Sequence, residues 1–294
     1  MDSPRTLPAT YYAASEGSRL GQRRFLTTTR IRLVALFLAA VGGAASWTAG
    51  SFDLLGWLAL LAFTTALATE FYQLTTDPVH LWYEARAATE STKTVTWRYL
   101  VGGDPFPAGM DPHRADEQFL SRLHDILEGL ASVALPPIDD SDEQITPYMR
   151  ERRATSFEER RELYLTDRIT SQARWYGREA RRHDRMARAC TAAAVALEFA
   201  GVIGATLKAF GRFDIDLLGM LGAGAAGVMA WSQARQYAYN SRAYSVAYQE
   251  LAAIRSELRA VPEADWARYV QDAEEAISRE HTLWRASKGL SPRR

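Results

Sequence analysis

The sequence predicts an all-α integral membrane protein with two transmembrane helical hairpins, four spans in all, continued by long cytoplasmic helices. Two observations predict this fold class. Four apolar runs, nearly free of charge, fall in two pairs, and the polar segments around them have helical periodicity. Runs of this length that are apolar on all faces are not typical of helices in a soluble bundle.

The first pair of runs covers residues 33–52 and 54–72. The first run holds no charged residue and is long enough, as a helix, to cross a bilayer core of roughly 30 Å. Only Asp53 separates the two runs, so we expect a tight hairpin. Phe71 and Tyr72 extend the second run into the interfacial zone where aromatic side chains settle.

The second pair covers residues 189–207 and 217–234, joined by a tip rich in charged and turn-forming residues. Arginines gather at the outer ends of both pairs, whereas the first tip has none and the second has only Lys208 and Arg212, opposite Asp214 and Asp216. The positive-inside rule therefore predicts that both hairpins enter the membrane from the cytoplasm and return to it. We expect a membrane protein whose termini and central linker are cytoplasmic.

The polar segments are predicted to form the cytoplasmic helices. Ser156 and Glu159 form a capping box, and the helix that starts at Phe157 is expected to run into the third span. The fourth span is expected to continue along a packed seam of Tyr237, Tyr244, Tyr248, Leu251 and Leu258. Pro262 begins a last helix with one apolar side, formed by Trp266, Val270, Ala273, Ile277 and Trp284.

The first half has a comparable helix, marked by Phe119, Leu120, Leu123, Ile126, Leu127 and Leu130. Four arginines near the middle of the chain alternate with acidic residues and are interpreted as a salt-bridged helix surface: Arg152, Arg153, Arg160 and Arg161. We place the boundary between two modules near Thr155, which gives modules 1–155 and 156–294.

Short marks repeat around the two hairpins and suggest duplication. A Gln-x-Arg-aromatic pattern precedes each pair, as Gln22, Arg24 and Phe25 and again as Gln172, Arg174 and Trp175. A Tyr-x-x-Arg-Ala pattern follows each pair, as Tyr83 with Arg86 and as Tyr239 with Arg242.

Glu198 interrupts the third run near its centre. A carboxylate at this depth costs roughly 2.5–3.5 kcal/mol, so it normally faces a bundle interior or water. One hypothesis is that Glu198 lines a cation path in an oligomer. The other is that it joins helices by hydrogen bonds, with Ser46, Thr64, Thr65 or Ser232 as partner.

Small residues recur every four positions in two of the spans, a spacing that lets helices approach closely. They are Gly42, Ser46 and Gly50 in the first run and Gly219, Ala223 and Gly227 in the fourth. The arginines from Arg174 to Arg188 are interpreted as a collar that sets topology or as a site for anionic headgroups or a nucleotide.

Composition argues against several function classes. The formal net charge is zero, which gives no reason to expect a nucleic-acid partner. Cys190 is the single cysteine and the five histidines are scattered, so no metal site, cofactor or catalytic triad is predicted. No phosphate-cradling loop is present, and we expect a protein that is not an enzyme.

Two further segments stand out, TYYAASEGSRLGQRRFL, with Trp97, Arg98 and Tyr99 farther on, and YLTDRITSQARWYGREARRHDRMAR. They resemble the SLATT superfamily, the SMODS and SLOG-associating two-transmembrane effector domains, as two tandem modules of different subtype. In the second module Tyr164, Arg168, Gln172, Trp175 and Tyr176 carry the resemblance. The resemblance implies an effector of bacterial anti-phage conflict systems that perforates the inner membrane.

We therefore expect an oligomeric pore in the lipid bilayer, a homo-oligomer opened by a nucleotide second messenger or a sensor protein. A non-conducting membrane-anchored scaffold or signal transducer is the alternative. A small transporter ranks third, because the repeat has the same topology in both halves rather than an inverted one.

Overall fold

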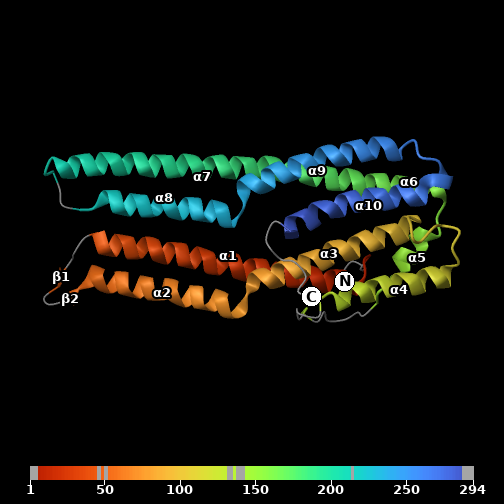
Figure 1. The fold of residues 1–294 in the computed structure, drawn as a ribbon, viewed down its shortest axis with the longest axis horizontal. Coiled ribbons are helices and arrows are strands. Elements are labelled where there is room, and N and C mark those ends of the chain that lie inside the picture. The colour runs from red at the N-terminus through yellow and green to blue at the C-terminus, as the bar shows by residue number, and fades with distance from the viewer. Residues whose placement is uncertain are drawn as a thin grey trace. The chain divides into compact units, whose positions relative to one another are not determined.

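A computed structural model describes residues 6–44, 48–49, 52–130, 135–136, 143–212 and 215–286, and it is helical almost throughout (Figure 1). Its helices are α1 (Ala9–Ala44), α2 (Leu54–Thr76), α3 (Pro78–Val101), α4 (Pro112–Glu128), α5 (Pro147–Arg153), α6 (Phe157–Leu163), α7 (Ser171–Ala209), α8 (Leu217–Ala234), α9 (Tyr237–Leu258) and α10 (Glu263–Ala286). A π-helical segment, η1 (Tyr164–Thr170), joins α6 to α7. The predicted all-α class is confirmed.

The chain folds into two compact units, and each unit takes segments from both halves of the sequence. The first unit comprises Met1–Gln22, Val79–Arg178 and Ala243–Arg294. The second comprises Arg23–Pro78 and Glu179–Arg242, and so contains both hairpins. Packing therefore groups the two hairpins together and the polar helices together, instead of following the order of the tandem repeat.

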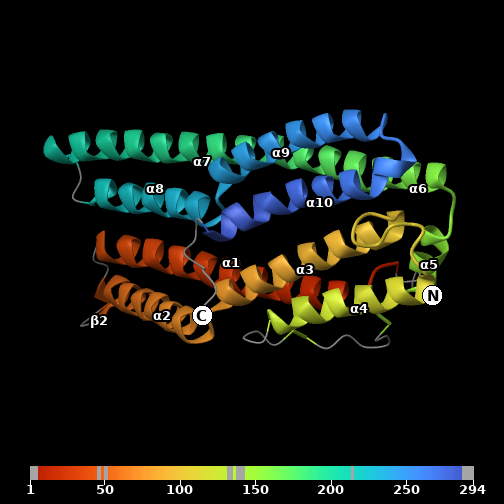
Figure 2. The same ribbon diagram turned by 45° about the vertical axis from the view of Figure 1, so that its right-hand side comes forward.

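In the first hairpin, α1 and α2 lie side by side and antiparallel (Figures 1 and 2). Helix α1 ends at Ala44, and two-residue strands, β1 (Thr48–Ala49) and β2 (Phe52–Asp53), pair at the tip. The predicted helical span to residue 52 is therefore wrong at its end, because the chain must reverse before Asp53. The Asp53 carboxylate accepts a hydrogen bond from the Gly56 amide at 3.1 Å and so caps α2.

In the second hairpin, α7 and α8 lie side by side (Figure 1). Asp216 caps α8 by accepting a hydrogen bond from the Gly219 amide at 3.1 Å. A Cβ on Gly204 would come within 2.7 Å of the Leu217 side chain, so glycine there permits close approach of the two helices. The bounds of α8 are those predicted for the fourth span.

Four helices are long and apolar enough to span a membrane: Ala9–Ala44, Leu54–Thr76, Phe157–Ala209 and Leu217–Leu258. Large apolar side chains point outward from the hairpins, and Leu61, Leu67 and Phe199 are each about two-thirds exposed. Outward apolar surface on this scale is stable in hydrocarbon and not in water. The predicted four-span membrane protein is therefore supported by both length and surface.

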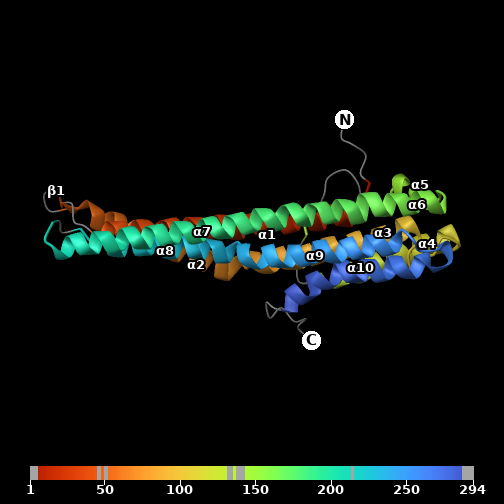
Figure 3. The ribbon, with the colours of Figure 1, turned by 90° about the horizontal axis from the view of Figure 1, so that it is seen from above.

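The polar helices of the first unit surround an aromatic interior. Helices α3 and α4 lie side by side in Figures 1 and 2, and the Tyr99 and Phe119 rings lie 4.9 Å apart between them. Helices α9 and α10 form a second pair (Figures 1 and 3). The Trp266 indole donates to the Val101 carbonyl at 2.7 Å, which ties α10 to the end of α3.

The burial of individual side chains can be compared with the predicted seam on α9 and with the predicted apolar sides of α10 and α4. Tyr237, Tyr244, Leu251 and Leu258 are buried as predicted, and the apolar side of α10 is buried at Trp266, Val270, Ala273 and Ile277. The side chain of Trp284 lies outside the described residues. In the first half Phe119, Leu123 and Leu130 are buried and Ile126 is half-buried, but Leu120 and Leu127 are exposed. Tyr248 is 46% exposed, so its place in the seam was predicted wrongly.

The arginines near the middle of the chain are not a uniform salt-bridged surface. Arg161 pairs with Glu158 at 2.6 Å, as expected. Arg153, however, donates to the backbone carbonyls of Tyr99, Phe106 and Pro107 at 2.8–2.9 Å. Arg153 therefore holds the loop after α3 in place, because its planar guanidinium can reach several carbonyls at once.

We predict that Gly42→Ala destabilises the first hairpin by about 1–3 kcal/mol, a typical cost of overpacking. A Cβ there would lie 2.6 Å from the Leu55 carbonyl oxygen and 3.1 Å from the Ala59 Cβ, so α1 and α2 would have to separate. Unfolding in mixed micelles of increasing SDS content measures the change. Gly43→Ala is the matched control, because a Cβ there meets nothing within 4 Å. Equal stability of the two variants would contradict the close approach.

Candidate functional site

Glu198 lies on the exposed surface of α7, within the apolar part of the helix. Among the described residues, no hydrogen bond or ion pair reaches its carboxylate. Two of the partners considered from the sequence are engaged elsewhere, since the Thr64 and Thr65 hydroxyls donate to the carbonyls of Leu60 and Leu61. Ser46 lies outside the described residues. The described residues of this chain therefore offer the Glu198 carboxylate no partner.

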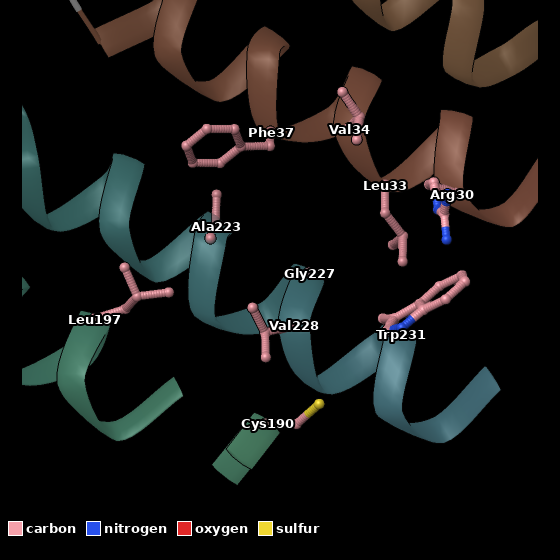
Figure 4. A pocket seen from close by; sticks show the side chains of 11 residues that line it. Arg30, Leu33, Val34, Phe37, Cys190, Leu197, Ala223, Gly227, Val228 and Trp231 are labelled. Carbon is pink, nitrogen blue, oxygen red and sulfur yellow. The ribbon is translucent and has the colours of Figure 1, made fainter. Parts of the chain in front are cut away.

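The small residues of the first and fourth runs differ in what surrounds them. Gly42 lies at a close approach of α1 and α2, whereas Gly50, like Ser46, lies outside the described residues. A Cβ on Gly219 would meet only the Asp216 carboxylate that caps its own helix. Ala223 and Gly227 line an apolar groove of about 570 Å³ between α1, α7 and α8 (Figure 4).

A buried ion pair forms the polar centre of the first unit. The Arg168 guanidinium donates to both carboxylate oxygens of Glu274, at 2.8 and 2.6 Å, and both side chains are almost fully buried. The Tyr164 hydroxyl and the Thr94 hydroxyl each donate to Glu274 at 3.0 Å. The Glu274 carboxylate thus accepts four hydrogen bonds, which offset the free-energy cost of removing it from water. A buried charge without partners would have no such compensation.

Arg168 reaches Glu274 from the π-helical segment η1, which contains both Tyr164 and Arg168. A π-helical turn changes the direction of side chains relative to a regular helix and often occurs at functional positions. Burial, followed by the charge of Glu274, raises the pKa of Tyr164 well above its ordinary value, so its hydroxyl stays protonated as a donor. The resemblance identified Tyr164 and Arg168, and the structure now gives them a shared partner.

A second polar cluster lies beside the ion pair in the first unit. Lys93 donates to the Gln172 side chain at 3.3 Å, and burial together with the charge of Arg168 lowers the pKa of Lys93. Burial opposes the charge of Arg86, but Tyr244 and Glu90 outweigh it and raise the Arg86 pKa. Three rings pack against this cluster, those of Trp175, Tyr176 and Tyr244, with centroids 5.1–5.5 Å apart.

The repeat marks occupy different environments in the two halves. Tyr83 is buried and Arg86 is half-buried, whereas Tyr239 and Arg242 are exposed. Arg24 and Arg174 are both exposed, and Gln22 and Phe25 are half-buried. The Tyr-x-x-Arg-Ala marks are therefore not structurally equivalent, since the first supplies the buried cluster and the second faces outward.

Glu274 was not found by reasoning from the sequence. It lies on α10 among Asp272 and Glu275, in a helix whose acidic residues are otherwise typical of a solvated face. The available signal was its position between the apolar residues Val270, Ala273 and Ile277, which puts residue 274 on the buried side.

We predict that Glu274→Ala destabilises the protein by about 3–5 kcal/mol, because it leaves the Arg168 charge buried without a partner. Thermal unfolding in detergent measures the loss. Arg268→Ala is the matched control on α10, where it removes an exposed pair with Asp265 worth at most about 1 kcal/mol. The double variant Arg168→Met, Glu274→Leu should recover part of the loss. A Glu274→Ala variant as stable as the control would contradict this assignment.

Comparison with known protein families confirms the resemblance. A family model described as SMODS and SLOG-associating 2TM effector domain 3 matches residues 8–161, and one described as SMODS and SLOG-associating 2TM effector domain 1 matches residues 164–284. No curated protein and no solved structure matches the chain. The chain therefore belongs to the SLATT superfamily as two tandem two-transmembrane effector domains, which makes it a membrane-associated effector of conflict systems.

Proposed function

We propose that this chain is a membrane pore or channel-like effector, a homo-oligomer that permeabilises the bacterial inner membrane in anti-phage defence. Its opening is triggered by a nucleotide signal or a sensor protein, and the chain itself catalyses no reaction. Family membership supports the effector role, and the position of Glu198 is the observation that carries the pore.

In a single copy of the chain, Glu198 is exposed near the middle of the third predicted span, where exposure of a charge to lipid is costly. A charged side chain near the bilayer centre costs roughly 2.5–3.5 kcal/mol unless it reaches water or a polar partner. The described residues of the same chain offer no such partner. Copies arranged around an axis parallel to the membrane normal would turn this face of α7 inward, and a ring of carboxylates around water would favour cations.

The continuity of α7 supports control of the pore by the polar helices. Residues Phe157–Ala209 are helical without interruption, from the π-helical segment that holds Arg168 to the end of the third span. A change in the buried ion pair would therefore act on the same helix that carries Glu198. The arginines at the outer ends of both hairpins support the proposal that the termini and the polar helices are cytoplasmic.

We predict that purified protein in liposomes releases a self-quenched dye and that Glu198→Gln abolishes its preference for cations over anions. The neutral amide keeps the shape of the side chain but removes the charge that attracts cations. Reversal potentials in planar bilayers under a salt gradient measure the preference. Glu250→Gln is the control, because Glu250 is an exposed acid on α9, outside the predicted spans.

Unchanged ion selectivity in Glu198→Gln would contradict its role in the pore. The absence of any leak, together with normal growth of cells that overproduce the protein, would instead favour a non-conducting membrane scaffold.

A further inference from the structure

The first groove in the second unit runs beside α1, among helices that are long and apolar enough to span a membrane. Val34 and Phe37 of α1 lie on one side, and Ala223 and Gly227 of α8 lie on the other (Figure 4). Its volume is about 570 Å³, within the range of about 300–1,000 Å³ typical of ligand pockets. A Cβ on Gly227 would meet nothing within 4 Å, so the absence of a side chain at this position leaves the groove open.

A second groove lies between α1 and α2, with a volume of about 360 Å³. Ala62 and Thr65 of α2 contribute to its wall, and the remainder is almost wholly apolar. Arg30 and Val34 line both grooves. The two grooves therefore meet along one side of α1, and the same arginine stands where they meet.

Arg30 is exposed and carries its charge at this shared end. Its guanidinium lies 5.2 Å from the centre of the Trp231 ring, which holds it over the end of the first groove. No carboxylate among the described residues pairs with Arg30, in contrast to Arg32, which forms an ion pair with Glu70 of α2. The ring covers one face of the guanidinium and leaves its N–H donors free for an anion.

We infer that the two grooves bind the two acyl chains of an anionic phospholipid whose phosphate pairs with Arg30. Within the hydrocarbon region an apolar groove is filled by hydrocarbon, since its walls offer water no hydrogen bonds. An occupant with two apolar chains and one negative charge matches two apolar grooves that share one cation. Basic pockets between transmembrane helices bind anionic headgroups by this combination of charge and apolar contact.

This lipid has a structural role at the hairpins. With both grooves filled, α1 is embedded between α2 and the α7–α8 hairpin through contacts that the protein alone does not make. Bound lipid would therefore stabilise the second unit, increasingly as its concentration exceeds the dissociation constant, because it binds the folded hairpins and not the unfolded chain.

Native mass spectrometry of the purified full-length protein tests the inference, with phosphatidylglycerol and phosphatidylcholine added in equal amounts. We expect each chain to retain one phosphatidylglycerol in preference to phosphatidylcholine. Arg30→Gln should lower this preference by about five-fold or more, the contribution of one arginine near an anionic surface. Gly227→Leu should reduce retention of both lipids, because the new side chain enters the first groove.

Matched controls separate these effects from general ones. Arg24→Gln removes an exposed arginine of α1 that lines neither groove, and Gly222→Leu adds a side chain at an equally open position away from the grooves. Both controls should retain lipid as the unaltered protein does. A single-chain lysophosphatidylglycerol should bind more weakly than the two-chain lipid.

A second measurement uses Cys190, which lines the first groove and is the single cysteine of the chain. Added phosphatidylglycerol should slow its alkylation by N-ethylmaleimide, and Arg30→Gln should weaken this protection. Equal retention of the two phospholipids, or equal effects of Arg24→Gln and Arg30→Gln, would overturn the inference. So would a change of oligomeric state in Gly227→Leu with unchanged lipid retention, because the groove would then be an interface between copies.

Discussion

Arg168 and Glu274 place two opposite charges in an interior from which water is excluded, and the first unit is arranged around them. Arg168 lies near the start of the second SLATT domain and Glu274 near its end, while Thr94, which also donates to Glu274, belongs to the first domain. The Trp266 indole, bonded to the Val101 carbonyl, joins the same two domains. The polar helices of the tandem domains therefore share one core, and neither domain alone supplies all the donors that the buried carboxylate requires.

This shared core explains why the two compact units of the fold do not correspond to the two tandem domains of the sequence. Two hairpins and two sets of polar helices exist in the sequence, but burial is greatest when like segments pack with like. Apolar spans pack in one unit and amphipathic helices in the other. Two consecutive modules can be recognised from the order of segments along the sequence. The grouping of helices into two compact units depends instead on contacts between residues that are far apart along the chain.

Most of the fold could be predicted because length and apolarity determine it locally. The four spans follow from the runs themselves, and the start of α6 follows from the capping box of Ser156 and Glu159, which is present. The end of α1 was not predicted in this way, because residues 45–52 hold no charged residue and continue the same run in the sequence. Tyr248 was assigned to the seam wrongly, because helical spacing shows which side chains share one face of a helix. It does not show how far along that face another helix packs.

The functional residues divide in the same manner. Glu198 was found because a charge stands out among apolar neighbours. Glu274 was missed because it has acidic neighbours on a polar helix, and only its spacing from the apolar residues of α10 indicated burial. Arg30 was one of several arginines near a span and appeared equivalent to Arg32. Only packing separates the two, by giving Arg32 a carboxylate and Arg30 the ends of two grooves.

The polar residues of the hairpins can be divided by whether they have a partner within the hairpins. The Gln73 amide donates to the Thr28 hydroxyl at 2.7 Å within the first hairpin, and Arg32 forms an ion pair with Glu70. Arg30 and Glu198 are the contrasting pair, each exposed and each without an oppositely charged partner among the described residues. They lie at different depths, one at the end of a span and one near the middle of another. A charge at the interface can be neutralised by a lipid headgroup, but a charge at the centre cannot, because headgroups do not reach it. The partners proposed for the two residues therefore differ, an anionic lipid for Arg30 and a water-filled space between copies for Glu198.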